Sequence, residues 1–175
     1  TVGNGAASAF AGSGTTYSAT ITPAVDGAVT VDVAAAAAQD SAGNDNTAAT
    51  QFSITNDGTA PTVVLSTAST DPVSGAFTLD VVFSESVTGF ALGDLTVGNG
   101  TASAFAGSGT TYSATITPAA DGAVTVDVAA AAAQDSAGND NTAAIQFSIT
   151  ADGTGPTVVL SSVSSDPVSG AFTLD

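Results

Sequence analysis

The residues best suited to chemistry in this chain are acids and amides in a short loop pattern that occurs twice. The second copy reads Asp-Ser-Ala-Gly-Asn-Asp-Asn from Asp135 to Asn141, and the first copy has the same letters from Asp40 to Asn46. Carboxylate and amide oxygens, without imidazole or thiolate competitors, are the ligands that Ca²⁺ prefers, and it needs six to eight of them. The pattern therefore predicts calcium binding.

A simpler interpretation of the same pattern is a turn closed by its own side chain. Asp135 would then accept hydrogen bonds from backbone N–H groups, while Gly138 supplies a positive φ. The spacing and closing Glu of an EF-hand are absent. Asp140 and Asn141 follow at once, and no positive side chain could neutralise them. These two observations favour calcium, although the turn interpretation is compatible with the sequence.

The overall composition excludes most catalytic devices. The chain has 16 acidic residues, a formal net charge of -16, and no Lys, Arg, His or Cys. A Ser nucleophile would have no base, a zinc site no imidazole or thiolate, and a phosphate clamp no cation. We therefore predict that the chain is not an enzyme. Its charge would repel nucleic acid and anionic membranes, and its longest apolar run, Val128–Ala133, is too short to insert in a bilayer.

The chain is a tandem repeat. Thr1–Asp80 aligns with Thr96–Asp175 at an offset of 95 residues, and 8 of the 80 paired positions differ. A row of near-identical units favours a mechanical or binding role, because length increases with each copy. We expect residues 1–55 to be the C-terminal part of one repeat and 56–150 a complete repeat with its entering linker. Residues 151–175 would be a linker and the N-terminal part of the next repeat.

Hydrophobic residues alternate with polar ones along most of the repeat. Phe77, Leu79, Val81 and Phe83 are one example, and a period of two indicates strands with one buried face. Turn residues separate these runs. The strands that we expect are 62–66, 76–83, a short one around Phe90–Leu92, then 95–97, 101–105, 111–117, 123–129 and 143–150. This number of short strands in about 95 residues predicts an all-β, immunoglobulin-like antiparallel sandwich.

The alanine run Ala129–Ala133 has high helical propensity and could instead form a helix. Five residues are too few for an independent helix, and they directly continue a Val-x-Val-x-Val strand. We expect a strand end or a single helical turn there.

The expected sandwich topology sorts the acidic residues into two ends. The end where the chain enters would gather Glu85, the loop Asp135–Asn141 and the linker residue Asp57, and the other end Asp71, Asp121 and Asp152. The ends of successive modules would meet in an array. The predicted calcium ligands are Asp135, Asn139, Asp140, Asn141, Glu85, Asp57 and, in the first copy, Asp40, Asn44, Asp45 and Asn46.

Several strings in the complete repeat together carry a family resemblance. They include Ala60-Pro61-Thr62-Val63, Phe83-Ser84-Glu85, Asp121-Gly122-x-Val124-x-Val126 and Asp135-x-Ala137-Gly138-Asn139-x-Asn141. The chain resembles the bacterial Ig-like repeats strung along giant surface adhesins. This resemblance implies an extracellular or cell-surface location in a surface-colonising, biofilm-type bacterium. It also implies a calcium-stiffened, non-catalytic extender whose partners are the neighbouring repeats, with adhesion assigned to other domains.

An alternative function uses the same modules as subunits of a self-assembling extracellular filament. Residues 1–55 lack the first strands of a repeat, whereas 156–175 offer them. Strand addition between chains could complete the module. Covalent continuity of a longer chain explains the same partial repeats, so the extender is the leading hypothesis.

Overall fold

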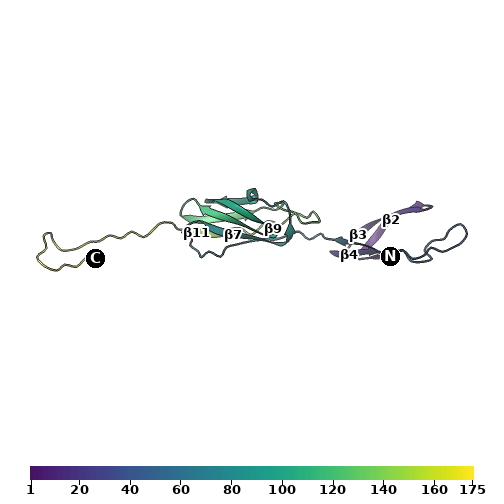
Figure 1. Ribbon diagram of the computed structural model, residues 1–175, viewed down its shortest axis with the longest axis horizontal. Coiled ribbons are helices and arrows are strands. Elements are labelled where there is room, and N and C mark those ends of the chain that lie inside the picture. Colours follow the sequence, from purple (N-terminus) through teal and green to yellow (C-terminus); the bar gives the residue numbers. More distant parts are fainter.

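The computed structural model describes residues 1–175 and has an elongated shape (Figure 1). A β-rich N-terminal copy, a central sandwich and an extended C-terminal segment follow one another along its long axis. No helix in the structure has the length and apolar character needed to cross a membrane.

Two three-stranded antiparallel sheets form the central module. Their strand orders are β6-β7-β9 and β11-β10-β8. The strands are β6 Val63–Ser66, β7 Phe77–Val87, β8 Leu95–Gly98, β9 Gly100–Pro118, β10 Gly122–Val128 and β11 Phe147–Ala151. This arrangement confirms the all-β antiparallel sandwich expected from the sequence.

The alternation in sequence places the core between the two sheets. On β7 the apolar residues at 77, 79, 81 and 83 are each at most 4% exposed, whereas Val82 between them is 41% exposed. On β10, Val124 and Val126 are both fully buried. Burying a side chain of this size contributes roughly 1.5–3 kcal/mol, so these facing rows account for much of the module's stability.

Four aromatic rings close the core at the end that receives the linker. Phe83 and Phe90 meet edge to face with ring centroids 5.1 Å apart, and Phe90 meets Tyr112 in the same way at 5.1 Å. Phe105 stacks on Tyr112 at 5.7 Å. The Tyr112 hydroxyl donates a hydrogen bond to the Val87 carbonyl, so this buried ring keeps a polar partner.

The strand β9 folds back on itself as a hairpin. A Cβ added to Gly100 would lie 2.8 Å from the Thr117 carbonyl oxygen, and one added to Gly107 would lie 2.3 Å from that of Thr111. The N-terminal copy has the same hairpin as two separate strands, β2 Gly5–Ser13 and β3 Thr16–Pro23. The strands expected over 101–105 and 111–117 are the two arms of this hairpin.

The strand expected around Phe90–Leu92 is wrong. Gly89 has a φ of 89°, and the chain then forms the 3₁₀ helix η1 over Leu92–Asp94. Asp94 Oδ2 accepts a hydrogen bond from the Ala91 N–H at 2.8 Å and so closes this turn. Phe90 is apolar because it anchors the turn in the aromatic cluster, not because it belongs to a strand.

Two strand boundaries differ from expectation, and one is that β7 continues to Val87 rather than ending at Phe83. The last strand starts at Phe147 rather than Ala143, because the residues before it make only isolated backbone bonds and the continuous ladder with β10 begins at the pair Val126–Phe147. The Thr142 N–H bonds to Pro61, and the Ala144 N–H bonds to Val128. The alanine run Ala129–Ala133 forms a turn, so the helical alternative is wrong.

The N-terminal copy repeats only part of this architecture. It has the hairpin β2-β3 and the sheet β1-β4-β5, made of β1 Val2–Gly3, β4 Gly27–Val31 and β5 Phe52–Asn56. Without counterparts of β6 and β7, several of its core-type side chains are uncovered: Phe10 is 75% exposed and Ile54 58% exposed, although Val29 is still buried. The C-terminal segment after Ala151 contains no strand.

Candidate metal centre at the module junction

The acidic loop, Asp135–Asn141, connects β10 to β11 on the side of the sandwich that meets the linker. Asp135 Oδ1 accepts hydrogen bonds from the N–H groups of Ala137 and Asn139, both at 2.8 Å, and its Oδ2 accepts one from Asn139 Nδ2 at 2.8 Å. These bonds, led by the one from the Asn139 side chain, lower the pKa of Asp135 although its side chain is buried. The turn interpretation is therefore correct for Asp135, and the turn keeps its carboxylate ionised.

Three carboxylates meet beside this loop, and we call them the junction carboxylates. One oxygen each from Asp57, Glu85 and Asp135 lie within 4.8 Å of one another. Asp57 comes from the linker, Glu85 from the end of β7 and Asp135 from the acidic loop. Loss of hydration raises the pKa of Glu85, and repulsion from Asp57, Asp135 and Asp26 raises it further.

The spacing of the junction carboxylates fits a hard divalent cation. Calcium binds oxygen at about 2.3–2.6 Å, so two of its ligands are at most about 5.2 Å apart. Three side-chain oxygens within 4.8 Å satisfy this limit. They supply about half of the ligands that calcium needs, and backbone carbonyls or water would have to complete the shell. No Lys or Arg exists in the chain to neutralise this charge instead.

The other candidate ligands of the acidic loop do not all lie beside the junction carboxylates. Asn139 lies at the junction, because its Nδ2 donates a hydrogen bond to the backbone oxygen of Asp57 at 3.1 Å. Asp140 is outside the junction carboxylates and bonds to Gln134. Asn141 is 1% exposed, and its amide bonds to three backbone groups of the loop and its flanks. These bonds use the Asn141 amide to hold the loop backbone, and its role as a calcium ligand stays a prediction.

The sequence matches the family model of the bacterial Ig-like domain over residues 1–55 and again over 57–151. The chain belongs to this family. No curated protein and no solved structure matches it. Bacterial Ig-like domains are typically non-enzymatic structural modules, and they are often extracellular or surface-exposed.

The N-terminal Ig-like copy has the same turn but no carboxylate group around it. Asp40 Oδ1 accepts hydrogen bonds from the N–H groups of Ala42 and Asn44, as Asp135 does in the acidic loop. Asp45 bonds to Gln39, and Asn46 bonds to the loop backbone. Asp40 belongs to no group of three carboxylates like the one at the junction. The four candidate ligands in this copy, Asp40, Asn44, Asp45 and Asn46, therefore belong to the same kind of loop but have no counterpart of the three junction carboxylates beside them.

One junction residue of the Ig-like array was not selected from the sequence. Asp26, in the turn between β3 and β4, accepts a hydrogen bond from the Gly58 N–H at 2.7 Å and another from the Thr59 hydroxyl. These bonds lower its pKa, with the one from Thr59 contributing most. The sequence does contain a sign of this contact, because both of its partners recur 95 residues later. Asp26-Gly27 recurs as Asp121-Gly122, and Asp57-Gly58-Thr59 recurs as Asp152-Gly153-Thr154.

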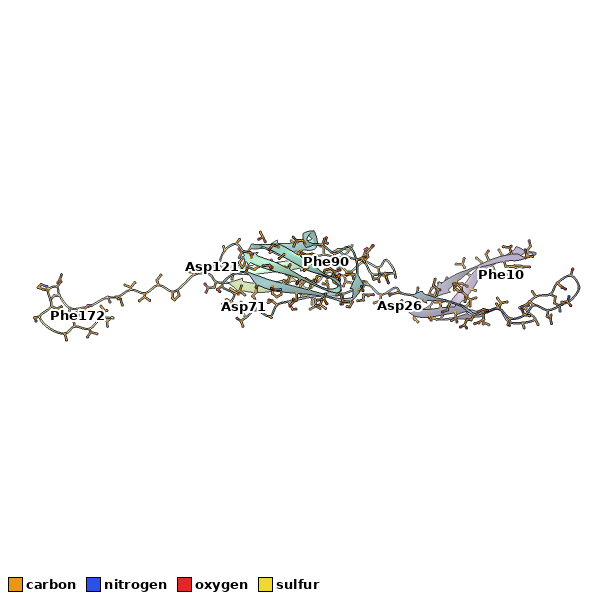
Figure 2. All side chains as sticks on the ribbon, in the orientation of Figure 1. Phe10, Asp26, Asp71, Phe90, Asp121 and Phe172 are labelled. Carbon is orange, nitrogen blue, oxygen red and sulfur yellow. The ribbon has the colours of Figure 1, made fainter.

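The opposite end of the central Ig-like module carries a second set of acids. Figure 2 shows Asp71 and Asp121 at this end and Asp26 at the other. Asp71 Oδ1 accepts a hydrogen bond from the Thr150 N–H at 3.0 Å, and the Asp152 N–H donates to the Val73 carbonyl. At this end of the module, where the chain leaves it, the acidic segment is therefore held mainly by hydrogen bonds to the backbone.

Proposed function

We propose that this chain is part of a non-catalytic extender of a large extracellular bacterial adhesin or surface fibre, in which calcium stiffens the module junctions. The observation that carries the proposal is the junction itself: the linker presents Asp57 to Glu85 and Asp135 of the next module, with no positive group present. The neighbouring repeats are its partners, and the adhesive ligand belongs to other domains.

Charge explains how such a junction would respond to calcium. Without a cation, three carboxylates repel one another at the point where two modules meet, which opposes close approach of the modules. Calcium bound between them would replace repulsion with shared coordination. Extracellular calcium modules bind at about 10⁻⁴–10⁻³ M, so ten times that concentration adds about 1.4 kcal/mol to the bound state. This energy is enough to favour one interdomain angle.

Millimolar calcium should raise the melting temperature of the central module by roughly 5–10 °C, because about 1 kcal/mol corresponds to about 4–8 °C in a domain of this size. Glu85→Gln should abolish most of this rise. In chelator the same variant should be slightly more stable than the parent, because it removes repulsion from Asp57 and Asp135. Differential scanning calorimetry with and without calcium measures both effects.

Glu85 is the most informative position to change, since the turn depends on the hydrogen bonds of Asp135 and an alanine there would also disturb the loop. Asp40→Asn is the matched control, because Asp40 makes the same turn without the other carboxylates. It should leave the calcium response intact. Equal melting curves in calcium and chelator for the parent chain would refute calcium binding at the junction.

A second candidate function is the filament subunit, and the exposed apolar residues of the partial repeats favour it. Phe10 and Ile54 are uncovered in the N-terminal copy, and Val158 and Phe172 are 82% and 55% exposed in the C-terminal segment. Segment 156–175 matches 61–80, which supplies β6 and the start of β7 in the central module. A second chain could therefore add these strands.

Sedimentation velocity of the 175-residue chain separates the two candidates. The extender predicts a single species across micromolar concentrations, whereas the filament predicts head-to-tail oligomers that grow with concentration. Phe172→Ser, in the segment equivalent to β7, should dissolve such oligomers, and Ser165→Ala, in the loop between the two added strands, should not.

A further inference from the structure

The linker of this chain is held by hydrogen bonds from both modules that it joins. On the side of the preceding module, the Asp26 carboxylate accepts hydrogen bonds from the Gly58 N–H at 2.7 Å and from the Thr59 hydroxyl. On the side of the following module, Asn139 Nδ2 donates to the backbone oxygen of Asp57 at 3.1 Å. Three consecutive linker residues, 57–59, thus contact two different modules.

The contact with the preceding module recurs one period later. Asp121 accepts a hydrogen bond from the Gly153 N–H at 2.6 Å and another from the Thr154 hydroxyl. Each linker also closes a small turn of its own, in which the first Asp accepts the N–H of the Thr at 3.2 Å. The same pattern forms at 152–154, where no folded module follows. The preceding module alone is therefore sufficient to shape the linker.

The contact with the following module uses an amide rather than a carboxylate. Asn139 is oriented by Asp135, whose Oδ2 accepts one hydrogen bond from the same Nδ2 at 2.8 Å. An N–H donor bound to a backbone oxygen needs no cation to bridge it. This contact is available whether or not the junction carboxylates bind a metal.

We propose that the Asp-Gly-Thr linker and its two partners, Asp26 and Asn139, form a metal-independent clasp that sets the angle between successive modules. The proposal rests on the extender function, and it gives the clasp and calcium separate roles. The clasp specifies the geometry, and calcium, where it binds, narrows the motion about that geometry. Asp26 and Asn139 are positioning residues that present Asp57 to Glu85.

The test is a distance distribution between two spin labels in the full chain, measured by double electron–electron resonance. The chain has no cysteine, so Ser53→Cys and Ser148→Cys label it specifically. Both serines are exposed on β5 and β11, and they are equivalent positions in adjacent repeats. In chelator the parent should give a defined peak at the same mean distance as in calcium.

Two variants break the clasp from opposite sides, and each has a matched control. Thr59→Val removes the hydroxyl that bonds to Asp26, and Thr154→Val removes the same group from the second linker, outside the labelled span. Asn139→Ala removes the donor to Asp57, and Asn44→Ala makes the same change in the N-terminal loop. We expect Thr59→Val and Asn139→Ala to widen the distribution in chelator at least about twofold, and the controls to leave it unchanged.

The possible results separate the clasp from the calcium proposal. No defined peak in chelator, with a peak only in calcium, would overturn the clasp and leave calcium as the ordering agent. Broadening that is equal in variants and controls would also overturn it. A narrow peak in chelator that the two variants widen, with no response to calcium in distance or melting, would support the clasp while refuting calcium stiffening. Circular dichroism confirms that each variant keeps its β structure.

Discussion

Phe83→Ala should lower the free energy of unfolding of the central module by about 3–5 kcal/mol, out of a typical domain stability of about 5–15 kcal/mol. Phe83 is 2% exposed and packs edge to face against Phe90 and Tyr112 at 5.1 and 5.9 Å. Alanine would leave a cavity in a cluster whose other rings are fixed by the hairpin and the turn at Gly89. Urea unfolding followed by circular dichroism measures the loss.

The control for Phe83 is its neighbour on the same strand. Val82 points out of the sandwich and is 41% exposed, so Val82→Ala should cost less than about 1 kcal/mol. A loss below about 1 kcal/mol for Phe83→Ala would show that the aromatic cluster does not stabilise the module.

Asn141→Ala should destabilise the central module by on the order of 3 kcal/mol. The Asn141 amide satisfies the Ala133 N–H at 2.7 Å and the carbonyls of Ala129 and Thr142 at 3.0 and 2.8 Å. Its removal leaves these groups without partners beside the core, and each such group costs about 1–3 kcal/mol where water cannot replace the bond. Thermal and urea unfolding both report this change.

The first copy provides a matched control for this substitution. Asn46 makes the corresponding bonds to Ala38, Ala34 and Thr47, but it is only partly buried. Water can reach the groups that Asn46→Ala would free, so we expect a loss of no more than about 1 kcal/mol in the unfolding of the N-terminal copy. If Asn141→Ala instead left the stability unchanged but weakened calcium binding, Asn141 would be a calcium ligand.

The sequence predicted the sandwich because its alternation reports burial directly. The alternating apolar positions of β7 and β10, at 77–83 and 124–128, are the buried ones, and the expected strands there overlap those observed, although β7 continues to Val87. The strand expected at Phe90 was wrong because an apolar residue in a turn has the same appearance as one in a short strand. Only the packing of Phe90 against Phe83 and Tyr112 distinguishes them.

The candidate site was predictable only in part. Topology was enough to place Glu85 and the acidic loop at the end of the module that meets Asp57, and the three carboxylates do meet there. Side-chain direction was not predictable, since an asparagine in a loop can point to a cation or to its own backbone, and Asn141 does the latter. Asp26 was missed because its partners, Gly58 and Thr59, are brought to it by the path of the linker.

Small-angle scattering on chains lengthened by whole copies of residues 57–151 tests the central claim most directly. In millimolar calcium the account predicts that the maximum dimension grows by an equal increment for each added module, as in a rod. In chelator the growth should be smaller per module, because each junction moves more widely about its mean angle, and Glu85→Gln in every copy should remove the difference. Identical scattering profiles in calcium and chelator would contradict the proposal that calcium stiffens an array of these modules.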